Sequence, residues 1–276
     1  MRRRPDRALL ALVLPLLAFV AFGAARVDAP ASLIGLLFDR PAEFAAVATV
    51  LALGGAVLLV IPAVERRVAH LFAPSRAPTA EEDARLRRLL GRVGERAGTR
   101  TDRLVPRVQE AHELNAAAGA VRLLFVTDTA LRCTDAELEA LLAHELGHHR
   151  GLHPLATAVV WWLSLPGELL AAVFRVLRGL AADLRVRPLV LLVGLVLLVW
   201  QVLVMWLYYV GKLLAQWAAR VSEFVADAAA ADWGYGEQLA ALYRDADVPV
   251  PQGLVARLLA EHPPMPARIE RIGSGA

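Results

Sequence analysis

The stretch Ala143-His144-Glu145-Leu146-Gly147-His148-His149-Arg150-Gly151 places two histidines four residues apart, with a glutamate directly after the first. On a helix this spacing puts both imidazoles on one face. Two neutral imidazoles suit zinc, which at catalytic sites takes three protein ligands and keeps a fourth position for water. An adjacent carboxylate can deprotonate that water. The pattern is typical of a metalloprotease centre with Glu145 as its base.

The residues just before this stretch predict that it lies on a helix. Thr134 and Glu137 have the spacing of a capping box, in which each residue hydrogen-bonds the backbone of the other. Leu138, Leu142 and Leu146 then form an apolar stripe at helical spacing. The alternative is a polar helix face with solvated histidines, and the cap and the stripe argue against it.

The composition points to a membrane protein. The chain has 276 residues, of which 57% are hydrophobic and 21% are charged, and its mean hydropathy is +0.49, too apolar for an ordinary soluble domain. The formal charge of +3 comes almost wholly from arginine, since Lys212 is the only lysine. Arginines that flank apolar runs indicate a membrane surface rather than nucleic acid. Cys133 is the only cysteine, so no intrachain disulfide and no thiolate cluster is possible.

Two apolar runs lie in the N-terminal quarter of the chain. Ala8–Ala25 follows an arginine-rich start and is either a cleaved signal peptide or a retained membrane helix. The second run, Phe44–Val64, favours the retained helix, because the two runs together can form a membrane hairpin. Both outer flanks are rich in arginine, which predicts that they face the cytoplasm.

Two further apolar runs follow the histidine motif. Leu155–Phe174 is interrupted by Pro166-Gly167-Glu168, whereas Leu189–Val210 is almost wholly apolar and ends in aromatic residues typical of a membrane interface. If the metal ligands lie on both sides of these runs, the chain between them crosses the membrane an even number of times. The sequence therefore predicts about four transmembrane helices. The alternative is a re-entrant pair that enters and leaves on the cytoplasmic side.

Soluble segments surround the motif. A proline-containing linker, Ala73–Thr79, leads into a second capping box, which predicts a helix. Val121–Thr127 is rich in apolar and β-branched residues and reads as a short strand. Asn115–Gly119, just upstream, is either an exposed edge that pairs with an extended peptide or merely a turn.

The third metal ligand has to come from another part of the chain. Glu223 is the best candidate, because alanine density predicts a helix around it. Asp227 lies one turn later and can accept a hydrogen bond from a ligand imidazole. The rivals for the third ligand are Asp227 itself, Glu237 and Glu261, and the alternative explanation of the pair is a solvated acidic stripe. The residues alone leave this choice open.

Four separate stretches resemble the HtpX-like membrane zinc metalloproteases, a family that also contains the CAAX prenyl endopeptidases. Their order along the chain matches the family. They are the strand Leu123–Thr127, the helix Glu139–His148, the helix with Glu223 and Asp227, and the segment His262–Ile269.

The resemblance implies a zinc endopeptidase with one zinc ion per chain. The ligands would be His144, His148 and Glu223, with Glu145 as the catalytic base. Asp227 would support a ligand histidine. By the same resemblance, His262 and Arg268 would shape the cleft or support the transition state, and Asn115 would begin the strand that binds substrate.

The expected fold is a mainly α integral membrane protein with a zincin-like metalloprotease domain that contains a small β-sheet. Its expected parts are an N-terminal transmembrane hairpin (1–72), the first part of the metalloprotease domain (73–153), a second transmembrane hairpin or re-entrant pair (154–211), and the second part of the domain (212–276).

The expected activity is hydrolysis of peptide bonds in membrane proteins or their cytoplasmic segments, in protein quality control. The expected location is a cell membrane, a bacterial inner membrane in the first instance, with the active site facing the cytoplasm. The partners would be a peptide or membrane-protein substrate and the lipid bilayer, without nucleic acid. Two alternatives are a signal-transducing membrane metalloprotease of the beta-lactam-sensor type and a catalytically silent zinc-binding membrane scaffold.

Overall fold

The computed structural model describes residues 39–58, 60–72, 74–119, 121–150, 216–245 and 262–274, and single residues between 151 and 215. They belong to two compact units. One unit contains the described residues of 58–150 and 216–274, and the other contains residues 39–57 and the single described residues between 151 and 215. The histidine motif and the segments that resemble the protease family all fall in the first unit.

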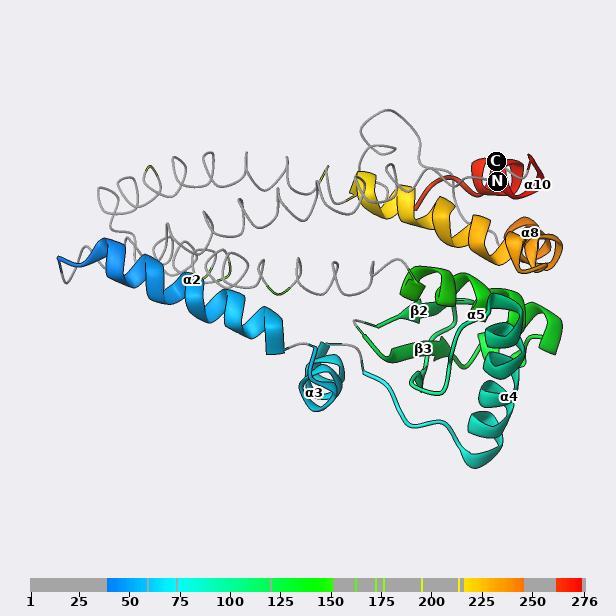
Figure 1. Cartoon of the computed structure of the whole chain (residues 1–276), viewed down its shortest axis with the longest axis horizontal. Coiled ribbons are helices and arrows are strands. Elements are labelled where there is room, and N and C mark those ends of the chain that lie inside the picture. Colours follow the sequence, from blue (N-terminus) through cyan, green and yellow to red (C-terminus); the bar gives the residue numbers. More distant parts are fainter. Residues whose placement is uncertain are drawn as a thin grey trace. The chain divides into compact units, whose positions relative to one another are not determined.

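The first unit is mainly helical and contains one small sheet (Figure 1). This agrees with the expected domain. In chain order its elements are α3 (Pro62–Phe72), α4 (Ala80–Ala97), β1 (Val105–Gln109), β2 (Ala116–Ala118), β3 (Leu123–Thr127), the 3-10 turn η1 (Ala130–Arg132), α5 (Asp135–Arg150), a helical stretch over residues 216–232, α8 (Gly236–Asp245) and α10 (Met265–Ser274).

Strand β3 is the centre of the sheet. It pairs in parallel with β1 and antiparallel with β2, giving the order β1-β3-β2, and all five of its residues are buried. The predicted strand is thus confirmed, with a start at Leu123. Asn115–Gly119 contains the edge strand β2 and is not merely a turn. No other described residue pairs with the outer edge of β2, whereas Arg76 bridges to Val108 on the outer side of β1.

Both predicted capping boxes are present. Thr79 and Glu82 cap α4 reciprocally, and the Thr134 N–H donates to the Glu137 carboxylate at 2.8 Å at the start of α5. Beyond the cap of α5, its leucine stripe is buried in a core shared with the apolar face of α4. The core therefore fixes the helix that carries the two histidines, and Figure 1 shows α4 beside this helix.

The apolar run Phe44–Val64 does not form one continuous helix, so its prediction as one unbroken stretch is wrong. Helix α2 (Pro41–Leu58) ends within the run, and α3 begins at Pro62. The Ile61 N–H donates to the Leu58 carbonyl in a turn between them. A proline suits the first position of a helix, and it disfavours helical geometry in the residue before it.

Among the described residues, none of the helices combines the length and apolar character needed to cross a bilayer. The predicted span Ala8–Ala25 lies outside the described residues, and Leu155–Phe174 and Leu189–Val210 do so apart from isolated positions. The four predicted parts of the chain stay a prediction.

Candidate metal centre

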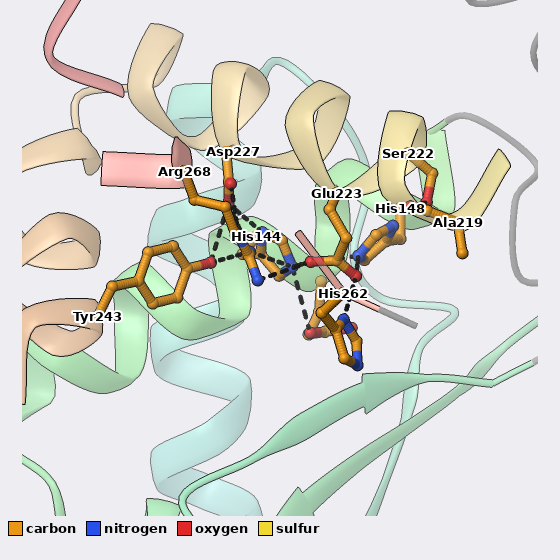
Figure 2. Close-up of polar contacts among 10 residues, drawn as sticks. His144, His148, Ala219, Ser222, Glu223, Asp227, Tyr243, His262 and Arg268 are labelled. Carbon is orange, nitrogen blue, oxygen red and sulfur yellow. Dashed lines mark hydrogen bonds and ion pairs between the residues drawn. The ribbon is translucent and has the colours of Figure 1, made fainter. Parts of the chain in front are cut away.

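Two helices meet at the candidate site with almost no space between their backbones. At Gly147 on α5, an added Cβ would lie 2.9 Å from the Ala226 Cα and 3.0 Å from the Ala226 carbonyl oxygen. Such distances leave room only for glycine, so Gly147 lets the helical stretch 216–232 cross directly over α5. The crossing brings the residues on either side of Ala226, Glu223 and Asp227, towards the histidine face of α5 (Figure 2).

Three side chains converge beside this crossing. The Nε2 atoms of His144 and His148 are 3.1 Å apart. The Glu223 carboxylate lies 3.5 Å from the Nε2 of His144 and 3.5 Å from that of His148, through different oxygens. Donors held 2.0–2.1 Å from a tetrahedral zinc ion would be about 3.3 Å from one another. The three groups therefore fit one metal ion, and their residues are all buried.

Asp227 determines which nitrogen of His144 faces this cluster. The Asp227 Oδ1 lies 2.9 Å from the Nδ1 of His144, so the imidazole donates there and directs Nε2 towards Glu223. Burial lowers the pKa of His144, but its hydrogen bonds with Asp227 and Glu223 outweigh burial and raise the pKa to about 9 without a metal. The two carboxylates thus favour a positive charge on His144.

Arg268, from α10, ties the two carboxylates together. It lies 2.8 Å from a Glu223 oxygen and 2.8 Å from each Asp227 oxygen. The Tyr243 hydroxyl, from α8, donates to Asp227 at 2.8 Å and accepts a short hydrogen bond from Arg268. The sequence predictions did not include Tyr243. Burial would raise the pKa of Glu223, but its hydrogen bonds with the histidines and the Arg268 charge hold that pKa well below its usual range.

Glu145 faces the cluster without being one of its three closest groups. Its carboxylate lies 4.0 Å from the Nε2 of His144. His144, Glu145 and His148 form a potential metal-binding group whose ligand atoms lie within 4.8 Å of one another. Burial raises the pKa of the Glu145 carboxyl, and the charges of His144 and His148, with a hydrogen bond from the Ala118 backbone, oppose that rise. Glu145 is therefore a buried carboxylate at the inner end of the edge strand.

The remaining predicted residues lie around this cluster. The Nδ1 of His262 is 3.1 Å from a Glu223 oxygen, and its side chain is 63% exposed, so it stands at the mouth of the site. Asn115 lies directly before β2, and its backbone bonds to Thr127 on β3 instead of to the cluster. Of the rival ligands, Glu237 lies in the first turn of α8 and, unlike Glu223, makes no ion pair with the two histidines, and Glu261 lies outside the described residues.

Comparison with known families decides what this centre belongs to. The model of peptidase family M48 matches residues 80–275. This range includes α5 with the two histidines, the helix of Glu223, and α10 with Arg268. The chain belongs to peptidase family M48. This family contains HtpX and the CAAX prenyl endopeptidases, so the resemblance from the four stretches is confirmed. A search of curated proteins found no match.

Membership in M48 makes the matched region a metallopeptidase domain, and the group of His144, Glu145 and His148 is consistent with its H-E-x-x-H motif. Sequence reasoning also selected Glu223, Asp227 and Arg268. Tyr243 gave no such signal, because a tyrosine among apolar residues of an amphipathic helix is ordinary core composition.

Proposed function

We propose that this M48 protein is a zinc-dependent endopeptidase that is embedded in a membrane and cleaves membrane proteins or their cytoplasmic segments. One observation carries the proposal. The Nε2 atoms of His144 and His148 and the Glu223 carboxylate converge within 3.5 Å of one another, beside a fourth group, Glu145, that is free to act as a base.

Zinc held by His144, His148 and Glu223 would lower the pKa of a bound water and polarise the scissile carbonyl. Glu145 then takes the proton from the water onto a carboxylate oxygen and passes it to the leaving amine. Arg268 and Asp227 keep Glu223 and His144 in place. His262, exposed beside Glu223, is positioned to donate a hydrogen bond to the developing oxyanion.

The outer edge of β2 supports binding of an extended substrate. The Asn115 carbonyl and the Gly119 N–H bond to β3, and hydrogen-bonded positions alternate along an antiparallel strand. The backbone groups of Ala116 and Ala118 therefore point outward, and the Ala118 N–H reaches Glu145. A peptide that adds as a further strand would therefore lie beside Glu145, the proposed base.

Broad specificity follows from the same edge. All three residues of β2 are alanines, so strand addition selects for an extended backbone and makes few demands on substrate side chains. A protease that reads backbone conformation would attack locally unfolded segments. That property supports a role in protein quality control.

Membrane embedding is proposed from the apolar runs of the sequence and from α2. This helix carries large apolar side chains that are more than half exposed, among them Val50, Leu51 and Val57 at 68%, 69% and 70%. A contiguous exposed apolar surface of this kind marks an interaction with a membrane or another protein. The arginine-rich flanks of the N-terminal runs favour a cytoplasmic active site, as in a bacterial inner membrane.

Glu145→Gln tests the proposed chemistry. The full chain, purified in detergent with zinc, is expected to cleave fluorescently labelled casein as an unfolded substrate, to stop on chelation and to resume when zinc is restored. Glu145→Gln should keep its zinc and lose about 10² to 10⁴ in rate, because the amide cannot accept the proton. Undiminished turnover by the variant would contradict the role of Glu145. A wild-type chain that binds zinc and cleaves nothing would favour the silent scaffold.

A further inference from the structure

A buried carboxylate on α3 lies at the turn of the β2–β3 hairpin. Glu65 is only 4% exposed. Its Oε1 accepts the backbone N–H groups of three consecutive residues, Val121, Arg122 and Leu123, at 2.7, 3.0 and 3.3 Å. Three donors in succession fix the backbone on which they lie, because a buried carboxylate that lost them would be left uncompensated.

The backbone held by Glu65 is the return of the turn from β2 to β3. Gly119 closes this turn from the other side, with its N–H bonded to the Leu123 carbonyl at 2.6 Å. An added Cβ at Gly119 would lie 2.5 Å from the Leu123 Cβ, so the turn has no room for a side chain at this position. The His149 ring also hydrogen-bonds the Leu123 backbone. A displacement at Leu123 is therefore transmitted directly to Gly119.

The residue before Gly119 is the one that reaches the centre. The Ala118 N–H donates to the Glu145 carboxylate, and Ala118 stands opposite Leu124 in the ladder. A short series of backbone contacts thus connects Glu65, through Leu123 and Gly119, to the Ala118 N–H that bonds Glu145. No part of the proposed chemistry uses Glu65 itself.

We infer that Glu65 is a positioning residue, which holds the β2–β3 turn so that the Ala118 N–H orients Glu145 and the edge strand meets its substrate beside it. The inference rests on the proposed endopeptidase function. Helix α3 would then contribute to the reaction, because its Glu65 carboxylate fixes the position of strand β2 relative to Glu145.

Two substitutions at Glu65 separate positioning from simple stabilisation. Glu65→Ala removes the acceptor, whereas Glu65→Gln keeps an oxygen in the same place. In the zinc-loaded full chain, Glu65→Ala should speed hydrogen exchange at the amides of residues 118 and 121–123. It should also lower kcat by about 10- to 100-fold, as expected of a small misplacement at a reacting centre. Zinc content should be unchanged, and Glu65→Gln should recover most of kcat.

Glu82→Ala is the matched control, because Glu82 also accepts a backbone N–H, that of Thr79 at 2.7 Å, but caps α4 instead of the hairpin. It should lower the melting temperature and leave kcat of the folded fraction unchanged. If Glu65→Ala does not fold, Gly119→Ala disturbs the same turn with Glu65 in place and should likewise lower kcat while zinc is retained.

The outcomes distinguish this inference from the function on which it rests. Unchanged exchange at the Ala118 amide in Glu65→Ala would overturn the inference, with or without turnover. Faster exchange with wild-type kcat would also overturn it and leave the endopeptidase intact. An inactive wild-type chain would instead refute the proposed function, and the exchange measurements would still decide whether Glu65 holds the turn.

Discussion

Asp227 is the residue on which the most parts of the centre depend. Its two oxygens accept from the Tyr243 hydroxyl and the Arg268 guanidinium and face the Nδ1 of His144, and the residue is only 1% exposed. A carboxylate with this many partners cannot rotate without breaking several hydrogen bonds. Its orientation, and through it that of the His144 ring, is therefore fixed before any metal binds.

Glu223 and Asp227 are expected to differ in what their loss does to the metal. Glu223→Ala removes one of the three proposed donors and should leave the chain without zinc after dialysis. Asp227→Ala leaves all three donors and should weaken zinc binding by about 10- to 100-fold, because the His144 ring loses its orientation. Both are measured by metal analysis and by competition with a coloured chelator.

Full zinc occupancy in Glu223→Ala would mean that the ligand set is wrong. Glu237→Ala is the control for the loss of a nearby carboxylate, since Glu237 lies on α8 and makes no ion pair with the two histidines, and it should bind zinc as the wild type does.

Residue types limited what the sequence could predict at this scale. Histidine and glutamate at motif spacing carry chemistry that few other roles require, so His144, Glu145 and His148 were recognisable. Tyr243 and Glu65 were not, because their roles depend on backbone and side-chain partners 16 and 56 to 58 residues away. Such partnerships appear only once the elements have packed.

At the scale of elements, the crossing at Gly147 sets the distance between the histidine helix and the helix of Glu223. In Gly147→Ala the new methyl group would overlap the Ala226 backbone and push the helices apart. Overpacking of this kind costs about 1 to 3 kcal/mol, and the displaced Glu223 should also weaken zinc binding. Thermal unfolding with and without zinc measures the two effects separately.

Gly91→Ala on α4 is the matched control, because nothing lies within 4 Å of an added Cβ there. Alanine favours a helix over glycine by about 1 kcal/mol, so this variant should be at least as stable as the wild type. A Gly147→Ala chain as stable and as zinc-competent as Gly91→Ala would show that the close crossing is not required.

Elements with local signals were predictable and their partners were not. The capping boxes placed the starts of α4 and α5, and β-branched residues placed β3, because these signals depend on neighbours within a few residues. The sheet order β1-β3-β2 depends on non-local pairing, for which three alanines in β2 provide no sequence signal. The run Phe44–Val64 was misread because hydropathy outweighed the break that Pro62 introduces.

At the scale of the whole molecule, the metal centre combines two separate parts of the chain. The described residues of 58–150 and 216–274 belong to one unit, and the single described residues between them belong to the other. The even number of crossings expected between the two parts follows from their meeting at one metal. That argument needs only the identity of the ligands, so it was available from the sequence.

Single cysteines test this topology in a Cys133→Ser background. Ala77, exposed in the linker before α4, is expected on the cytoplasmic side and should be protected from a membrane-impermeant thiol reagent in intact cells. Position 182, between the last two apolar runs, should be labelled if both runs cross. Protection at both positions would contradict four spans and favour the re-entrant pair, provided that lysed cells label at both.

The entry of Arg268 into the centre also has a consequence for biosynthesis. Arg268 is 124 residues after His144 in the chain, yet it bridges the two carboxylates that orient the ligands. While a ribosome is still translating the segment between them, the nascent chain carries its histidine pair without the guanidinium that neutralises Glu223 and Asp227. The set of contacts described for the centre is therefore complete only after residue 268 has emerged.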